Sequence, residues 1–397
     1  MPWKETCVNE QRMKFIVAWK QGGWSMSDLC REFGISRKTG YKYIRRFQRH
    51  GLDGLKDEPR APHQHPNAVS TRIRELVIHT RKKHPLWGPK KLLAAMQYRY
   101  PSIRDWPSKN TVGRIIEREG LIKSQTRRKK SVPVQPLSHV TAPNDVWCAD
   151  YKGHFTVGNG QQCTPLTVTD AHSRFLIECR IVPSQDTGSA KAVFTDLFRQ
   201  FGLPYAIRTD NGTPFAARSL AGLSRLSVWW LKLGIQLERI EPGKPQQNGR
   251  HERMHRTLKQ STALPPRSTL EAQQRAFNEF KREYNYDRPH EALRNRFPAD
   301  LYAPSGRTFP EILPEVAYPT NMEIQKVNDA GNIICGGRLL FLTGALSGEI
   351  VGLEDISENH TRIHFCHAVL GVFDHFTRKF LRYSNPMSMV SEERKKM

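Results

Sequence analysis

Residues 145–155, DVWCADYKGHF, form a strand-like run in which one carboxylate, Asp150, stands among residues that we expect to be buried. Burying a carboxylate costs free energy unless the group is paired or binds a cation. Two more strand-like runs follow, CTPLTVTD at 163–170 and RFLIECRIV at 174–182. Short turns containing Gly, Asn and Ser separate the three runs, and this pattern predicts an antiparallel meander.

Helices and strands alternate beyond the meander. We expect a helix at 187–201, the strand YAIRTD at 205–210, a helix at 217–233, the strand IQLERI at 235–240, and helices at 247–262 and 269–285, followed by the segment YNYDRPHEAL. The order βββαβαβα predicts an α/β core with helices on the faces of the sheet.

Two more acidic residues stand where a ligand site is expected. Asp210 closes the strand YAIRTD, at the carboxyl end where α/β sheets bind ligands. Glu252 lies in QQNGRHERMHRTLK, on the predicted helix 247–262. If the first and fourth strands are neighbours, Asp150, Asp210 and Glu252 converge. Three oxygen ligands suit Mg²⁺ or Mn²⁺, and two such ions about 3.5 to 4 Å apart promote in-line phosphoryl displacement.

The helix that carries Glu252 also carries basic residues. His255, Arg256 and Lys259 follow Glu252 at i+3, i+4 and i+7, so they are predicted to share its face. Arg256 and Lys259 are candidates for contact with a phosphodiester backbone, and Asn248, one turn before Glu252, is a candidate for DNA contact or loop ordering. The alternative is a solvated helix face with a favourable Glu-to-Arg pair.

Basic charge is concentrated in the first third of the chain. The full sequence of 397 residues has a formal net charge of +24, and residues 1–140 hold 30 basic against 11 acidic side chains. Residues 1–55 show three short helical patterns, with Gly34 at the turn and Ser36 as the cap of the third, as in a helix-turn-helix. The exposed side of this third helix offers the candidate DNA contacts Arg37, Lys38, Tyr41, Lys42 and Arg45.

The remaining segments complete a multidomain organisation. Residues 68–122 predict a second helix-turn-helix domain, in which Ser108 caps the last helix. Lys109, Asn110 and Arg114 are its candidate DNA contacts. A basic, proline-containing linker is expected at 123–144, the α/β core at 145–305, and a small β-barrel at 318–385, where short strands alternate with glycines. The alternative for 68–122 is a purely structural helical bundle.

Several polar residues near these segments have competing interpretations. Asp170, in VTDAHSRF, is expected to bond its own turn. Glu238 or Glu241 is an alternative third ligand to Glu252. His172, His251 and His255 are alternative general bases or phosphate contacts, although metal-activated water needs no base.

Membrane and disulfide-rich classes are disfavoured. No apolar stretch approaches the length of about 18 residues that a spanning helix needs, and the first residues lack the apolar middle of a signal peptide. The seven cysteines are scattered, never spaced as C-x-x-C, and are expected to be mostly buried hydrophobes. We therefore expect an intracellular, cytoplasmic protein without a membrane partner.

WCADYKG, VTDAHSRF, RTDNGTPF, PGKPQQNGRHERMHRTLK and YNYDRPHEAL, in this order, resemble the bacterial insertion-sequence transposases of the retroviral-integrase superfamily, over essentially the whole chain. The resemblance implies a ribonuclease-H-like core and an Asp-Asp-Glu metal triad at Asp150, Asp210 and Glu252. Forty-one residues separate Asp210 from Glu252, more than is usual in such proteins, and we expect the extra length in an enlarged helix over SLAGLSRLSVWWLKLG, 219–234.

The expected function is that of a nucleoid-associated bacterial DNA transposase. It binds the terminal inverted repeats of an insertion sequence, cleaves them with two Mg²⁺ ions that Mn²⁺ can replace, and joins the freed 3′-hydroxyl to double-stranded target DNA. Because two ends must be held together, at least a homodimer is expected. The rivals are a nuclease that uses the same core without joining, and a repressor-like protein with an inactive core.

Overall fold

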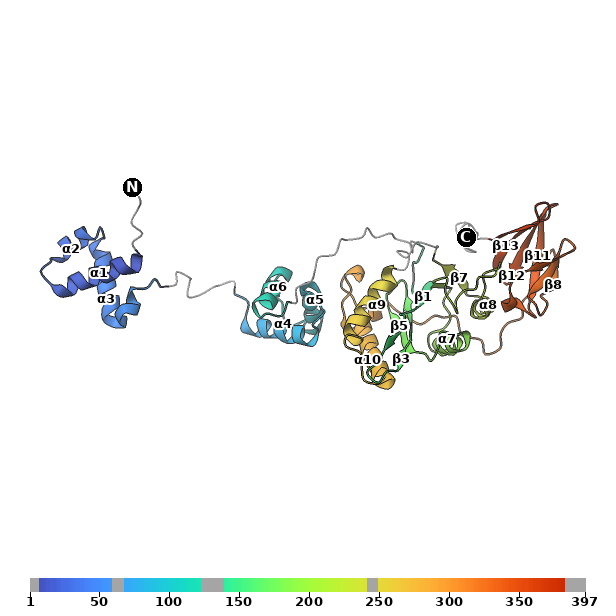
Figure 1. Cartoon of the computed structure of the whole chain (residues 1–397), viewed down its shortest axis with the longest axis horizontal. Helices are drawn as coiled ribbons and strands as arrows, with labels where there is room; N and C mark the ends of the chain where they lie inside the picture. The colour runs from blue at the N-terminus through green and yellow to red at the C-terminus, as the bar shows by residue number, and fades with distance from the viewer. Residues whose placement is uncertain (1–6, 59–67, 123–138, 241–248, 383–397) are drawn as a thin grey trace. The chain divides into compact units, whose positions relative to one another are not determined.

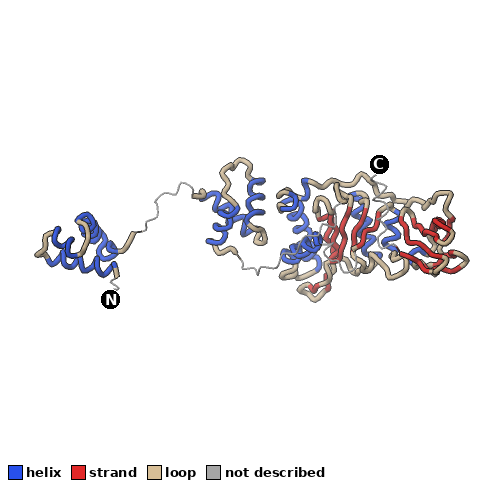
Figure 2. The backbone as a smooth tube through the Cα atoms, turned by 90° about the horizontal axis from the view of Figure 1, so that it is seen from above, coloured by secondary structure: helices blue, strands red, loops and turns tan. Residues whose placement is uncertain are grey.

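The computed structural model describes residues 7–58, 68–122, 139–240 and 249–382. The chain divides into two compact units, Met1–Val69 and Ser70–Met397. The described part of the first unit is helical, whereas the second combines helices with strands (Figure 1; Figure 2).

A three-helix arrangement forms the first unit. Its third helix is capped by Ser36, whose hydroxyl accepts a hydrogen bond from the backbone N–H of Thr39. Gly34 has a φ of +63° at the turn before this cap, a conformation that suits glycine. A Cβ on Gly40 would lie 2.7 Å from Cys30 Sγ, so the second and third helices pack closely. The helices are α1 (Val8–Gln21), α2 (Met26–Glu32) and α3 (Arg37–His50).

Three further helices begin the second unit. The side chains of Val77, Leu92 and Val112, one from each helix, are fully buried. Ser108 accepts a hydrogen bond from the N–H of Thr111 and so caps the last of them, as the sequence predicts. These helices are α4 (Thr71–Lys83), α5 (Pro89–Arg99) and α6 (Lys109–Arg118).

A mixed five-stranded sheet forms the centre of the second unit. Its strands run in the order β5-β4-β1-β6-β7, with β1 in the middle. β1 pairs antiparallel with β4 and parallel with β6, so the first and fourth strands of the core are neighbours, as expected. The strands are β1 (Val146–Tyr151), β4 (Pro165–Asp170), β5 (Leu176–Ile181), β6 (Ala206–Thr209) and β7 (Gln236–Arg239), and β2 (Phe155–Thr156) pairs with β3 (Gln162–Cys163) in a small separate hairpin.

Helices cover both faces of this sheet. Phe194 of α7 (Thr187–Phe201) and Trp230 of α8 (Arg225–Lys232) pack with Trp147 of β1 in one apolar cluster. Met254 of α9 (Gly249–Thr262) and Phe277 of α10 (Leu270–Arg282) pack against β3 and β5 in another.

The helix predicted at 217–233 is shorter than expected, because α8 begins only at Arg225. Ser224 and Ser227 form a reciprocal capping box that starts the helix there. Before the cap, the backbone N–H of Ala221 donates to the carbonyl of Leu342. The residues before Arg225 are therefore not part of the helix and are held against Leu342 of the C-terminal part, so the prediction of an enlarged helix is wrong.

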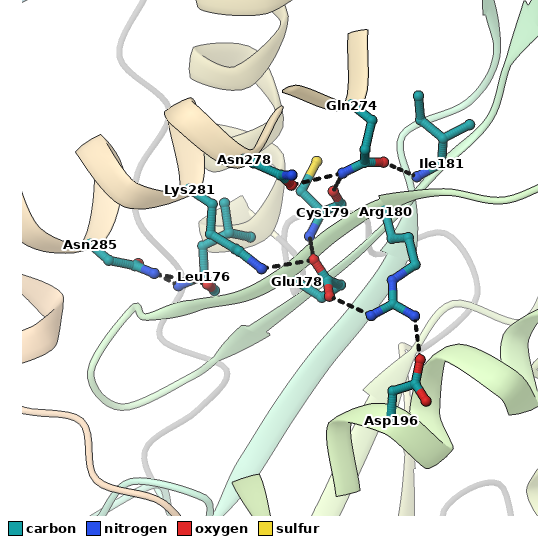
Figure 3. Close-up of polar contacts among 10 residues, drawn as sticks. All are labelled: Leu176, Glu178, Cys179, Arg180, Ile181, Asp196, Gln274, Asn278, Lys281 and Asn285. Carbon is teal, nitrogen blue, oxygen red and sulfur yellow. Dashed lines mark hydrogen bonds and ion pairs between the residues drawn. The ribbon is translucent and has the colours of Figure 1, made fainter. Parts of the chain in front are cut away.

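Side chains from α10 and from the π-helical segment Glu283–Asp287 that follows it pair with the edge strand β5 (Figure 3). Gln274 accepts from Ile181 N–H and donates to Cys179 C=O, and Asn285 does the same for the N–H and C=O of Leu176. An unpaired strand edge is a template for aggregation. Because these two amides take the place of a neighbouring strand, the edge is covered.

Antiparallel sheets form the C-terminal part. The five-stranded sheet has the order β14-β13-β12-β11-β8, and a second sheet consists of β9 and β10. We predicted a small β-barrel at 318–385; in the described residues the hydrogen-bonded order is open, with β14 and β8 as edges. The strands are β8 (Glu323–Lys326), β9 (Asn332–Cys335), β10 (Arg338–Phe341), β11 (Ile350–Ser357), β12 (His360–Phe365), β13 (Ala368–Asp374) and β14 (Lys379–Arg382).

Two further sequence-based expectations concern the whole chain. In the described ranges, none of the helices has the length and apolar character needed to cross a bilayer. All seven cysteines are free thiols, and five of them are buried, as expected of small hydrophobes.

Replacing Asn285 by the similarly shaped Leu should destabilise the protein. The N–H and C=O of Leu176 would lose their partners in a buried place, which should cost about 2 to 4 kcal/mol of unfolding free energy. Urea unfolding measures this difference. Asn278→Ala, which removes only an exposed contact to Gln274, should change the free energy by less than about 0.5 kcal/mol; equal effects of the two variants would contradict the proposed role of the edge.

Candidate active site

Asp150 lies near the end of β1, the middle strand of the sheet. Its register partner on β4 is Thr167, whose hydroxyl donates to the Asp150 carbonyl at 3.0 Å. The Asp150 side chain is 21% exposed, so the carboxylate is neither in bulk water nor sealed in the core. Burial is the main cause that raises the pKa of this carboxyl group from 3.8 to about 7.

Asp210 and Glu252 act electrostatically on Asp150. After burial, the negative charge of Asp210 contributes most to the raised pKa of Asp150, and the charge of Glu252 raises it further. Asp210 directly follows β6, the parallel neighbour of β1, and accepts a hydrogen bond from the Gly212 N–H at 3.1 Å. Glu252 is in the first turn of α9. The three predicted carboxylates thus come from neighbouring elements.

The outer face of α9 carries acidic and basic groups together. Glu252, Arg256 and Lys259 are exposed, as the helical spacing predicts. Lys259 and Lys152 line a common pocket whose floor is apolar, with Leu258 and Phe277. The helical spacing also predicted His255 on this exposed face, and that prediction is wrong. His255 is only 6% exposed and turns toward the sheet.

Two histidines of α9 contact the threonines of β4. His251 Nε2 and His255 Nε2 lie 2.7 and 2.6 Å from Thr167 Oγ1, and His251 Nδ1 lies 2.9 Å from Thr169 Oγ1. Burial lowers the pKa of His251 to about 3 and is the main cause that lowers the pKa of His255 to about 2, so both rings are neutral at physiological pH. A neutral, buried ring is a poor phosphate contact, and we place neither histidine in that role.

Thr167 and Thr169 were not singled out from the sequence. Two spacings in the sequence could have pointed to these residues. His251 and His255 are one helical turn apart on the apolar side of α9, with Met254 and Leu258. The two threonines are alternate residues of one strand. Neither spacing identifies its partner element, so only the fold joins them.

The donor set at this place fits a divalent cation. Asp150, His251 and His255 each offer a ligand atom, and these atoms all lie within 4.8 Å of one another. A bound cation also offsets the repulsion between this carboxylate and the two nearby negative charges. Carboxylate oxygen suits Mg²⁺ and Mn²⁺, and imidazole nitrogen suits the transition metals.

The competing acidic residues have structural partners. Asp170 accepts hydrogen bonds from the N–H groups of Asn144 and Ser173 and from the Ser173 hydroxyl, as expected for a turn residue. Glu238 is 2% exposed, forms an ion pair with Arg208 of β6 and lies within hydrogen-bond distance, 2.8 Å, of His139 Nε2. Its carboxylate is therefore already compensated within β6 and β7.

Two asparagines and one glutamate complete the neighbourhood. Asn211 donates to the Ile240 carbonyl at 2.8 Å and so orders the loop after Asp210. Asn248, a predicted DNA contact, and Glu241, a predicted alternative ligand, lie outside the described residues.

The predicted DNA contacts of both helical domains are on exposed surfaces. Every one of these side chains is exposed, while the apolar residues between them, such as Ile44 and Val112, are buried. The candidates are Arg37, Lys38, Tyr41, Lys42 and Arg45 on α3, and Lys109, Asn110 and Arg114 on α6. Both helices are amphipathic, and their basic side is available to a polyanion.

Known families match the same segments. Residues 140–245 and 233–298 match integrase core domains, residues 11–63 match a helix-turn-helix domain, and residues 39–116 match a homeodomain-like domain. These matches define the class: a DNA-binding protein with an integrase core.

Proteins of bacterial insertion elements are similar over much of the chain. The insertion element IS476 uncharacterized 39.2 kDa protein of Xanthomonas euvesicatoria is 29% identical, over 70% of this chain and 72% of its own length. The insertion element IS407 uncharacterized 31.7 kDa protein of Burkholderia multivorans is 29% identical, over 48% of this chain and 67% of its own length. The matches to integrase core domains and the similarity to insertion-element proteins support an insertion-sequence transposase of the DDE (retroviral-integrase) superfamily, a class of polynucleotidyl transferases.

Solved structures of retroviral integrases are also similar. The HTLV-2 integrase catalytic core domain in complex with magnesium is 16% identical, covering 40% of this chain and 97% of that one, with a TM-score of 0.32. The simian T-cell lymphotropic virus intasome, in complex with PP2A regulatory subunit B56 gamma, is 14% identical, covering 77% and 96%, with a TM-score of 0.36.

The stability of the metal-free protein should depend on the protonation of Asp150. Because folding raises the pKa of this group from 3.8 to about 7, its ionisation opposes folding fully above pH 7, and this penalty disappears as the pH falls toward 4. Asp150→Asn should therefore be more stable than the wild type at pH 8, by about 1 to 4 kcal/mol. Urea unfolding in a chelator measures the difference, and a difference that is constant from pH 8 to 4 would contradict the raised pKa.

Proposed function

We propose that this transposase binds the terminal inverted repeats of its insertion sequence, cleaves the strands at the repeat ends and joins them to target DNA. The observation that carries the proposal is the electrostatic grouping of Asp210 and Glu252 around Asp150. The matches to integrase core and helix-turn-helix domains support it.

The parts of the chain would divide this work. Residues 1–55 and 68–122 are proposed as the two repeat-binding domains, with 123–144 as the basic linker between them and the core. Residues 145–305 form the proposed catalytic core. Residues 318–385 would contribute DNA or subunit contacts, through the open sheet that takes the place of the expected barrel.

Asp150, Asp210 and Glu252 are the proposed ligands of two Mg²⁺ ions, for which Mn²⁺ can substitute. Ions at this site would promote attack by a hydroxyl and stabilise the departing oxygen. Because its pKa is raised to about 7, the Asp150 carboxyl group carries a proton in part of the metal-free molecules near neutral pH. That proton has to leave before the carboxylate can act as a ligand.

The two reactions need no nucleophile from the protein. In cleavage, the oxygen of water bonds to phosphorus, the bond from phosphorus to a 3′-oxygen breaks, and a 3′-hydroxyl remains at the end of the element. In joining, the oxygen of this hydroxyl bonds to a target phosphorus and displaces another 3′-oxygen. The exposed Arg256 and Lys259 would hold the phosphodiester backbone beside the three carboxylates. Asn248 is proposed as a further contact.

Two ends have to be held in one complex for joining, so we propose that the protein works as at least a homodimer on double-stranded DNA. The proposed location is the bacterial cytoplasm, on the nucleoid, where the substrate DNA is found.

Replacing any one carboxylate should abolish catalysis while repeat binding persists. In Mg²⁺, the wild type should convert labelled repeat-end oligonucleotides and a target plasmid into covalently joined products. Asp150→Asn, Asp210→Asn and Glu252→Gln should each reduce both steps by at least about 100-fold, with an unchanged mobility shift. Glu238→Gln is the control for an acidic residue outside the proposed site, measured on the fraction that folds.

The products separate this proposal from its rivals. Hydrolysis without joined products would indicate a nuclease, and binding without either reaction would indicate a regulator. Near-wild-type activity of any triad variant would remove that residue from the site.

Replacing Arg37 or Lys42 by Ala should weaken DNA binding in a salt-dependent way. Each side chain is exposed on α3, and each lost phosphate contact should reduce the slope of log K against log salt concentration by about 0.9. Fluorescence anisotropy with a repeat-end duplex at several salt concentrations measures the slope. Lys14→Ala removes the same charge from the exposed side of α1 and should leave the slope unchanged; equal slopes for all variants would mean that α3 does not contact phosphates.

A further inference from the structure

His255 is a buried imidazole that faces the proposed metal site. Its side chain is 8% exposed, and its Nδ1 lies 3.8 Å from Asp150 Oδ2. It extends from α9, one turn after Glu252, toward the strand pair β1 and β4.

The hydrogen bonds of Thr167 determine which nitrogen of His255 carries the proton. Thr167 Oγ1 has three polar neighbours: the Asp150 carbonyl at 3.0 Å, His251 Nε2 at 2.7 Å and His255 Nε2 at 2.6 Å. A hydroxyl has one proton to donate, and a carbonyl can only accept. The hydroxyl therefore donates to the Asp150 carbonyl and accepts from both Nε2–H groups.

This assignment leaves the acceptor His255 Nδ1 facing an oxygen of the Asp150 carboxyl group. With its proton on Nε2, the neutral His255 ring has a lone pair on Nδ1. Within the described ranges, Nδ1 makes no hydrogen bond, and the nearby polar atom is Asp150 Oδ2. When Asp150 is ionised, the two acceptors gain nothing from facing each other directly, whereas a cation between them would be bound by both.

We propose that His255 Nδ1 is an additional ligand of the divalent cation held by Asp150. Two donors that bind one ion with bonds of about 2.1 Å lie roughly 3 to 4.2 Å apart, depending on the angle between the bonds. The observed 3.8 Å lies inside that range. The inference rests on the proposed function insofar as Asp150 is a metal ligand.

His251 does not share this role, although its ligand atoms are also close to Asp150. Its Nε2 donates to Thr167, and its Nδ1 accepts from the Thr169 hydroxyl at 2.9 Å. Both nitrogens are therefore used, so His251 is a positioning residue that holds Thr167. This difference makes His251 a matched control for His255: the same residue type, the same helix, a similar burial and the same threonine partner.

A nitrogen ligand would change which metals the site prefers. Mg²⁺ strongly favours oxygen ligands, whereas imidazole suits transition metals. We therefore expect one of the two metal positions to bind Mn²⁺ more tightly than an all-carboxylate site would. Loss of the imidazole should lower Mn²⁺ affinity by about 10-fold, with a smaller effect on Mg²⁺.

Electron spin-echo spectroscopy of Mn²⁺ bound to the full-length protein tests this directly, without DNA or catalysis. Modulation from a directly bonded imidazole nitrogen should appear in the wild type, and labelling histidine with ¹⁵N should change its frequencies. The nitrogen modulation should disappear in His255→Gln and persist in His251→Gln. Circular dichroism and thermal unfolding show which variants fold, and His255→Asn replaces His255→Gln if the glutamine variant does not.

The outcomes distinguish this inference from the proposed function. A wild-type spectrum without histidine modulation, or modulation that survives in a folded His255 variant, would overturn ligation by His255. If Asp150→Asn still abolishes Mn²⁺ binding in that case, the carboxylate site stands. If Asp150→Asn binds Mn²⁺ as tightly as the wild type, the proposed metal site itself fails.

Discussion

Asp150 is held on the middle strand of the sheet, and the charges of Asp210 and Glu252 act on it there. Three acidic groups in a partly desolvated place repel one another when they are ionised, and a proton or a bound cation relieves this repulsion. The three groups come together because β1 pairs in parallel with β6 and the first turns of α9 contact β4, the other neighbour of β1. The sheet therefore provides an arrangement that a divalent ion would stabilise.

The surrounding structure keeps that arrangement rigid without adding charge to it. The Thr167 hydroxyl, fixed by two neutral imidazoles, donates to the Asp150 carbonyl and so fastens α9 to the strands. On the far side of β4, the amides of Gln274 and Asn285 cover the edge of β5. Asn285 belongs to the YNYDRPHEAL segment, so one residue of that motif has a structural role at the edge of the sheet. A site that must hold several ligands within tenths of an ångström depends on such supports.

Much of this architecture was predictable because its signals are local. The strand-like run around Asp150, the helix at 187–201 and the caps at Ser36 and Ser108 depend on residues near one another in the sequence. The helix expected over 219–234 was wrong for two reasons. The Ser224–Ser227 capping box was a local start signal that was overlooked, whereas the bond from Ala221 to Leu342 joins residues too far apart for any local pattern to reveal. Likewise, alternating glycines predict short strands, but not whether the sheet closes.

The candidate site divides in the same way. A carboxylate in an apolar strand is conspicuous because burying it would cost free energy, and the local sequence alone shows this. Asp150 became a candidate for this reason. A histidine in a helix carries no such signal, since i+3 spacing placed His255 beside Glu252 on a solvated face. A rotation of α9 about its axis by a fraction of a turn separates the two positions of His255. It decides whether His255 Nδ1 faces water or Asp150. At the proposed site, tertiary packing thus decides which further donors would reach an ion held by the carboxylates. The acidic residues of the proposed site stand out in the sequence, whereas the proposed preference among metals follows only from the fold.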